Sequence, residues 1–340
     1  MSEIRKKLNS LLERNYLPDG ESLISMCDCA TAVLEDENSY YRPKDKKMRS
    51  GGLLDFHEGD FSTLPVIVVP DLHARCDFLM HILDYHVFDN PLSVLELLEQ
   101  GKIMICCVGD IFHSEGREKI RWLTAFEEFC NEEYNGPAMT AEMVENLTLL
   151  QMLFVLKTSF PPFFHVLKGN HENVMNSETD GNRPFRKFCD EGNMVCTFLR
   201  NHYDDLALHY ISCFEKNLPL CAVFKNCIVT HAEPVRAFSR DEIINYHDSP
   251  DVTFGLTWTP NDDSFKNTSV LKTSKNLMGR KASKDVLWLA GHRPVLGKYE
   301  LRQGGSFVQI HNPKEENVAI VLPEKKFNPD TDIVNVLGIS

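Results

Sequence analysis

The chain has 340 residues and a mass of 38.9 kDa, enough for one large α/β domain or two smaller domains. Hydrophobic residues make up 43% of it and charged residues 25%, which excludes the disordered, collagen-like and coiled-coil classes. The formal net charge of −13 disfavours nonspecific nucleic-acid binding, because a phosphate backbone requires a basic surface. A locally positive site, such as a metal centre, remains compatible with an acidic surface.

Apolar runs and cysteines indicate the compartment. The longest apolar runs, such as residues 65–69, are far shorter than the ~18–20 residues of a membrane span. Residues 1–17 alternate charged and apolar groups and lack the apolar region of a signal peptide. The eleven cysteines include no CxxC pair, and such usage favours a reducing compartment. We therefore expect a cytoplasmic protein without a membrane partner, and the sequence leaves the oligomeric state open.

Residues 1–50 are predicted to form a helical N-terminal extension. Leu8, Leu11 and Leu12 recur at helical spacing, and a second helix is expected over residues 22–35. A polar stretch over residues 40–47 ends this segment.

From residue 64, short β-type runs alternate with longer helical patterns, which is typical of a layered α/β fold. Helices are expected over residues 78–98, 117–131 and 141–158, and strands over residues 306–310 and 318–322. The helix over 141–158 is nearly apolar all round and is therefore predicted to be buried. The polar segment 261–284 predicts loops. We expect one α/β domain over residues 51–325, followed by a C-terminal tail over residues 326–340.

One pattern occurs five times: a short apolar strand ends, and a side chain of a metal-binding type follows within about three residues. The strands are expected at residues 66–69, 103–108, 164–167, 227–229 and 286–290. The side chains that follow them are Asp71 and His73, Asp110, Asn170, His231, and His292. Because functional groups gather at the carboxyl ends of strands in α/β sheets, we expect these turns to converge on one site.

The residue types of this set indicate the metal. Carboxylate, amide and imidazole ligands without cysteine favour Mn, Fe or Zn over a structural thiolate zinc site. A carboxylate such as Asp110 can bridge two ions. Two dications against two carboxylates leave a positive site that suits a phosphate dianion, and a metal pair can clamp an in-line displacement. The sequence therefore predicts a dinuclear metal site at the carboxyl ends of strands.

The motifs DxH at Asp71, GD at Asp110, GNHE at Asn170, and the later His231 and Gly291-His292 resemble the calcineurin-like metallophosphoesterase superfamily. The resemblance implies a central β-sandwich flanked by helices, with the metals at one edge, so the domain over 51–325 would be a metallophosphoesterase domain. It also implies two ligand groups. The first metal would be held by Asp71, His73 and Asp110, and the second by Asp110, Asn170, His231 and His292.

The resemblance also implies the catalytic roles. His171 is similar to the histidine that protonates the leaving-group oxygen, while a metal-bridging hydroxide acts as the nucleophile. In the family, the position of Glu172 holds either Asp or Glu, and the resemblance implies that this side chain is not a metal ligand. A phosphorylated protein or small molecule is the substrate that this resemblance implies.

Two further segments indicate to which branch of the superfamily the chain is similar. Many superfamily members carry a second histidine where this chain has Pro294, and residues 256–260 resemble the LLWSDP segment of phosphoprotein phosphatases. This branch also contains the symmetrical dinucleoside tetraphosphatases. The predicted function is hydrolysis of phosphate monoesters by a protein-phosphatase-like enzyme. The alternatives are a dinucleoside polyphosphate hydrolase and a non-catalytic scaffold, although intact ligands at all six positions argue against a scaffold.

The second motif departs from that branch. Where the usual motif is GDxxDRG, this chain has His113 in place of the aspartate that orients the catalytic histidine. It has Ser114 in place of the arginine that binds phosphate. We predict that His113 has either a catalytic or substrate-binding role or a supporting hydrogen bond. Arg117, at an expected helix N-terminus, and Arg293, next to a ligand, are the predicted phosphate-binding residues.

Overall fold

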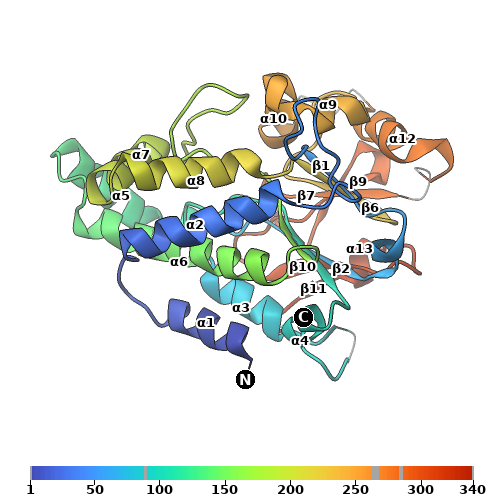
Figure 1. Ribbon diagram of the computed structural model, residues 1–340, viewed down its shortest axis with the longest axis horizontal. Coiled ribbons are helices and arrows are strands. Elements are labelled where there is room, and N and C mark those ends of the chain that lie inside the picture. The colour runs from blue at the N-terminus through green and yellow to red at the C-terminus, as the bar shows by residue number, and fades with distance from the viewer. Residues whose placement is uncertain (1, 88–89, 262–267, 283–285, 339–340) are drawn as a thin grey trace.

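Two mixed β-sheets pack face to face and carry helices on both outer faces, as the computed structural model shows (Figure 1). The structure describes residues 2–87, 90–261, 268–282 and 286–338. The five-stranded sheet has, in spatial order, β11 (Ile333–Asn335), β10 (Asn317–Val321), β2 (Val66–Val69), β3 (Met104–Cys107) and β4 (Phe164–Val166). The six-stranded sheet has β1 (Leu53–Asp55), β5 (Cys221–Val223), β6 (Cys227–Thr230), β7 (Leu287–Ala290), β9 (Phe307–Gln309) and β8 (Glu300–Arg302). The predicted helix-flanked sandwich is thus confirmed.

The strands are short and apolar because both faces of each sheet are covered. In β2, Val66 and Val68 face the core between the sheets, while Ile67 and Val69 face the helices. All four are buried. Burial of both faces explains why these strands appear in the sequence as continuous hydrophobic runs rather than as alternating ones.

The larger helical layer shares one apolar cluster with the outer face of the five-stranded sheet. Its helices are α1 (Glu3–Leu12), α2 (Gly20–Glu35), α3 (Cys76–Asp84), α4 (Val94–Glu99), α5 (Lys119–Cys130), α6 (Pro137–Ser159), α7 (Glu191–His202) and α8 (Asp205–Asn217). Helix α6 lies within this layer (Figure 1), and its predicted burial is confirmed. It is long and apolar enough to cross a membrane, but 78% of that stretch is buried inside the fold.

The N-terminal helices belong to the same layer. Leu8 of α1 and Leu23 and Leu34 of α2 are buried in the shared cluster, and α2 packs against α6 and α8. Ser2 and Asp19 cap the two helices by accepting backbone N–H groups. The helices predicted for residues 1–50 are present, while a domain boundary near residue 50 stays a prediction.

Two segments within the domain differ from the sequence prediction. The helix expected over 78–98 is broken into α3 and α4, because Ser93 and Glu96 form a capping box that starts a new helix. The segment 261–284, predicted to be loops, contains α12 (Ser269–Ala282), which packs Val270 and Leu277 onto the six-stranded sheet together with α9 (Arg240–Ile244) and α10 (Pro250–Thr257). Residues 88–89, 262–267 and 283–284 of these segments lie outside the described residues.

The expected C-terminal tail over 326–340 is in part a structured edge of the sandwich. After the short helix α13 (Pro329–Asp332), β11 pairs antiparallel with β10 through Ile333↔Ala319. Ile333 is fully buried between the sheets. Residues 339–340 lie outside the described part of the chain.

Candidate metal centre

Two sets of three parallel strands end at the edge of the sandwich where the predicted ligands lie. In one sheet, β2, β3 and β4 are parallel, and Val69 pairs with Cys107 at their ends. In the other sheet, β6, β7 and β9 are parallel, and Thr230, Ala290 and Gln309 are level. The turns after these strands therefore start side by side, which brings all six predicted ligands together.

The backbone of these turns is held in an uncommon conformation. His73, Asp110 and His292 have positive φ angles of 45°, 52° and 66°. Such angles disfavour non-glycine residues, and strain of this kind concentrates at functional sites. At Gly291 a Cβ atom would lie only 1.8 Å from Oδ1 of Asp71, so glycine is required for this close approach.

One group of ligands is formed by Asn170, His231 and His292. Oδ1 of Asn170 lies 2.9 Å from both Nε2 of His231 and Nδ1 of His292, and these two nitrogens are 3.2 Å apart. His231 donates its Nδ1–H to the carbonyl of Val108 at 3.0 Å, so its Nε2 carries a lone pair. Nε2 of His231 is also 3.4 Å from Oδ1 of Asp110. This convergence is the geometry expected for the second metal.

The other group is formed by Asp71, His73 and Asp110. Nε2 of His73 is 3.6 Å from Oδ2 of Asp110 and 4.0 Å from Oδ2 of Asp71. Nδ1 of His73 faces the carbonyl of Phe112 at 3.2 Å, which leaves Nε2 directed at these two carboxylates and at Oε1 of Glu115, which is 3.3 Å away. Asp71 is held by the backbone N–H of His292, which donates to both of its oxygens. Asp110 thus faces both groups, as its predicted bridging role requires.

Glu172 holds the turns that carry the ligands. Its carboxylate accepts backbone N–H groups from Asp110 at 3.0 Å and Ile111 at 2.8 Å. It also accepts the N–H of Gly169, directly before Asn170. The residue implied not to be a ligand therefore ties the turn after β3 to the turn after β4.

Burial and charge at this edge favour a cation. Burial and the neighbouring charges of Asp71 and Glu172 raise the pKa of Asp110 well above its ordinary value. Burial lowers the pKa of His73 to about 3, so its imidazole is neutral and able to bind a metal. Crowded carboxylates beside neutral imidazoles are the donor set that two metal ions require.

Comparison with known proteins identifies the family. The family profile for calcineurin-like phosphoesterases matches residues 64–322. The chain belongs to the calcineurin-like phosphoesterase family. It is therefore a metallophosphoesterase, a hydrolase of phosphoric esters, and the sequence prediction of this family is confirmed. No curated protein matches the sequence.

Solved phosphatase structures are similar to this chain. A serine/threonine phosphatase from Saccharomyces cerevisiae, described as similar to human phosphatase PP5, has a TM-score of 0.58 and 14% identity. The match covers 98% of this chain and 95% of that one. A cold-active protein-tyrosine phosphatase of a Shewanella species has a TM-score of 0.40 and 13% identity, over 79% of this chain and 80% of that one.

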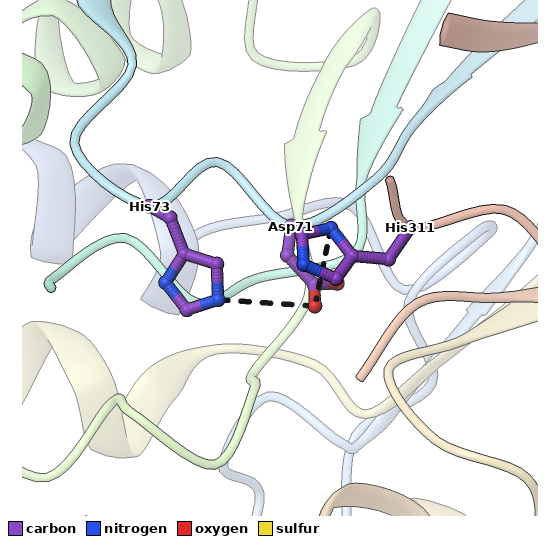
Figure 2. A group of neighbouring side chains, drawn as sticks. All are labelled: Asp71, His73 and His311. Carbon is purple, nitrogen blue, oxygen red and sulfur yellow. Dashed lines mark ion pairs between the residues drawn. The ribbon is translucent and has the colours of Figure 1, made fainter. Parts of the chain in front are cut away.

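A further histidine, His311, belongs to this edge of the phosphoesterase and was missed by the sequence analysis. It follows β9 and is fully buried, and Figure 2 shows its ring beside Asp71, across from His73. Nδ1 of His311 is 3.7 Å from Oδ2 of Asp71, and its Nε2 is 3.1 Å from Oε2 of Glu115. The available signal was the same strand-then-histidine pattern, at the strand predicted over 306–310.

The predicted proton donor lies beside the ligands. The backbone N–H of His171 donates to Oδ1 of Asp110 at 3.0 Å, and its Nε2 lies 3.8 Å from Oδ2. Its ring stacks on Phe185 at 4.4 Å between centroids. Among the described residues, Nδ1 of His171 has no hydrogen-bond partner.

His113 contacts His171 without hydrogen-bonding to it in the described structure. The two rings pack edge to face at 5.4 Å, and His113 stacks on Trp122 at 4.7 Å. Nδ1 of His113 accepts the backbone N–H of Glu115 at 2.9 Å, and its Nε2 faces Glu191 at 3.4 Å. Both ring nitrogens are thus engaged elsewhere, so the contact of His113 with His171 is one of ring packing, and a catalytic role of His113 stays a prediction.

The two predicted phosphate-binding arginines differ. Arg117 pairs with Glu145 at 2.7 Å rather than with a ligand, because its 3₁₀ turn directs Glu115 inward and Arg117 outward. Arg293 follows a ligand, and its buried Nε has no partner among the described residues. Lys187, which sequence reasoning missed, forms an ion pair with Glu115 beside His73.

Proposed function

We propose that this protein hydrolyses phosphate monoesters at a dinuclear centre of Mn, Fe or Zn, as a protein-phosphatase-like enzyme. The observation that carries the proposal is the convergence of acceptor atoms from Asn170, His231 and Asp110 on one point. Acceptors crowded this closely need a cation between them. When bound, the ions supply Lewis acidity and activate water.

The residues of the chain supply the other functions. Asp110 faces both ligand groups and would bridge the ions. His171 is held beside them by its backbone N–H bond to Asp110 and by Phe185, in position to donate a proton to the leaving-group oxygen. Arg293, which follows a ligand and has a buried Nε without a partner among the described residues, is the cation proposed to bind the phosphate oxygens.

The thiols support a reducing compartment, which we propose to be the cytoplasm. All eleven cysteines lie within the described residues and are free. Burial raises the pKa of the thiols of Cys106 and Cys107, which makes them unreactive. A phosphorylated protein or small molecule is the proposed partner.

A substrate panel tests the proposal. The purified chain is assayed with an aryl phosphate, phosphopeptides, nucleotides and dinucleoside polyphosphates, before and after chelation, with Mn²⁺ restored as the control. We expect chelator-sensitive release of phosphate from monoesters. Turnover confined to dinucleoside polyphosphates would identify the alternative hydrolase. Metal binding without turnover of any substrate would identify a scaffold.

A further inference from the structure

We propose that His311 is an additional ligand of the first metal through Nδ1, and that Glu115 is the positioning residue that orients it. This inference rests on the metal centre of the proposed function. It adds a protein ligand outside the motifs that identify the family.

The position of His311 in the sheet matches that of the other ligands. Strand β9 is parallel to β7, and Gln309 is level with Ala290. His311 therefore leaves the same edge as His292, two residues beyond each strand end. Its imidazole is fully buried among the ligands, where a side chain with a purely structural role would need both ring nitrogens satisfied.

Only one of the two ring nitrogens of His311 has a hydrogen-bond partner among the described residues. Its Nδ1 has no hydrogen-bond partner in the described part of the chain. The 3.7 Å from Nδ1 to Oδ2 of Asp71 is too long for a hydrogen bond, but it is short enough for both atoms to reach one ion at about 2.0–2.2 Å. The ligand atoms of Asp71, His73 and His311 all lie within 4.8 Å of one another (Figure 2).

Glu115 determines which nitrogen faces the metal. Nε2 of His311 is 3.1 Å from Oε2 of Glu115 and donates its proton to that carboxylate, so the lone pair is on Nδ1. A carboxylate that accepts the distal N–H of a metal-binding histidine fixes the tautomer and raises the basicity of the ligand. The other oxygen, Oε1, is engaged by Lys187 and lies 3.3 Å from His73.

Manganese titration of the full-length chain tests this assignment without any substrate. The parent and three variants are stripped of metal and titrated with Mn²⁺ alone, and the number and affinity of the bound ions are measured by calorimetry. His311→Phe keeps a ring of similar volume in the buried position and removes both nitrogens. Glu115→Gln removes the charge that orients His311. His81→Ala is the control, because His81 also pairs with a glutamate, Glu316 at 2.7 Å, outside the centre.

We expect His311→Phe to lower the affinity for one of the two Mn²⁺ ions by about tenfold or more and to leave the affinity for the other unchanged. Glu115→Gln should lower the affinity for the same ion by about 10–100-fold, the usual cost of removing an outer partner of a metal-binding histidine. His81→Ala should bind as the parent does. Thermal unfolding of each metal-free variant establishes that it is folded.

Parental affinity for both ions in His311→Phe would overturn the ligand assignment, and parental affinity in Glu115→Gln would overturn the orienting role. A parent chain that binds two ions but hydrolyses no phosphoester would contradict the proposed function alone. A parent that binds no Mn²⁺ would overturn both proposals.

Discussion

The metal centre and the Glu37 network (Glu37, Arg42, Lys157 and His165) are both clusters of buried titratable side chains, yet they differ in how their polar atoms are satisfied. In the network, the Glu37 carboxylate binds Lys157 at 2.5 Å and Arg42 at 2.6 Å. Arg42 also donates to three backbone carbonyls. The protein itself supplies every partner of this carboxylate.

At the metal centre, by contrast, several buried polar atoms have no hydrogen-bond partner within the described chain. Within the described chain, Nδ1 of His171, Nε2 of His292, Nδ1 of His311 and Nε of Arg293 are buried without a hydrogen bond. Seven other buried side-chain atoms of the described chain also lack a partner, but these four belong to the ligands and their sequence neighbours, which favours a ligand that the chain does not supply. Burial of charge alone therefore does not identify a site, because the Glu37 network is equally buried and is complete.

Substitution of Asp110 should have the largest effect. Asp110→Asn removes the carboxylate that faces both ligand groups, so we expect loss of activity and weaker binding of both ions. Metal analysis and an aryl phosphate assay measure the two effects together. Full metal content with unchanged turnover would show that Asp110 is not the bridge.

Loss of His171 should affect turnover but not metal content. We expect His171→Ala to lower kcat by roughly 10²–10⁴-fold, the usual span for general acid–base catalysis. The loss should be smaller for nitrophenyl phosphate, whose leaving group needs little protonation. An equal loss for all leaving groups would indicate that His171 positions the substrate instead.

Substitution in the Glu37 network should lower stability but not metal affinity. Lys157→Met leaves the Glu37 carboxylate without its lysine, and breaking a buried pair costs about 3–5 kcal/mol in the free energy of unfolding. Urea denaturation measures this change. The control Lys216→Met removes an exposed pair with Asp180 and should cost about 0–1 kcal/mol. Equal losses in the free energy of unfolding for Lys157→Met and Lys216→Met would contradict the expected difference between the buried and the exposed ion pair.

The same network predicts a pH dependence. Burial alone would raise the pKa of Glu37, but Lys157 and Arg42 outweigh it and hold that pKa well below its ordinary value of 4.5. Its stabilising contribution is therefore complete above pH 4.5 and is lost as the pH falls toward the lowered pKa. The difference in free energy of unfolding between the parent and Glu37→Gln should shrink on acidification. A constant difference would indicate that the carboxylate is not charged in the fold.

The two arginines should give the smallest effects and should differ. Arg293→Ala removes one charge-assisted contact to phosphate, worth about 1.5–3 kcal/mol, and should lower kcat/KM by about 10–150-fold. Arg117→Ala should stay within about twofold, because Arg117 pairs with Glu145. Measurements on one monoester compare them. A larger loss at Arg117 would show that the sequence prediction was right and that the ion pair opens for substrate.

Much of the centre was accessible from the sequence because its information is local. A short apolar run followed by Asp71, Asp110 or Asn170 indicates both a strand and its carboxyl end. The buried helix α6 was recognised for a similar reason, since its residues are apolar on all sides.

Other features depended on which elements become neighbours. His311 became part of the centre only because β9 lies beside β7, and no motif in the sequence marks that pairing. The direction of a side chain was equally inaccessible: Glu115 and Arg117 share one 3₁₀ turn, but the turn directs the glutamate toward His311 and the arginine toward Glu145. The sequence by itself determined the ligand types and their order, because strands and turns follow from local patterns. Only the tertiary structure decided which atoms meet, because strand pairing and helix orientation depend on packing across the whole sandwich.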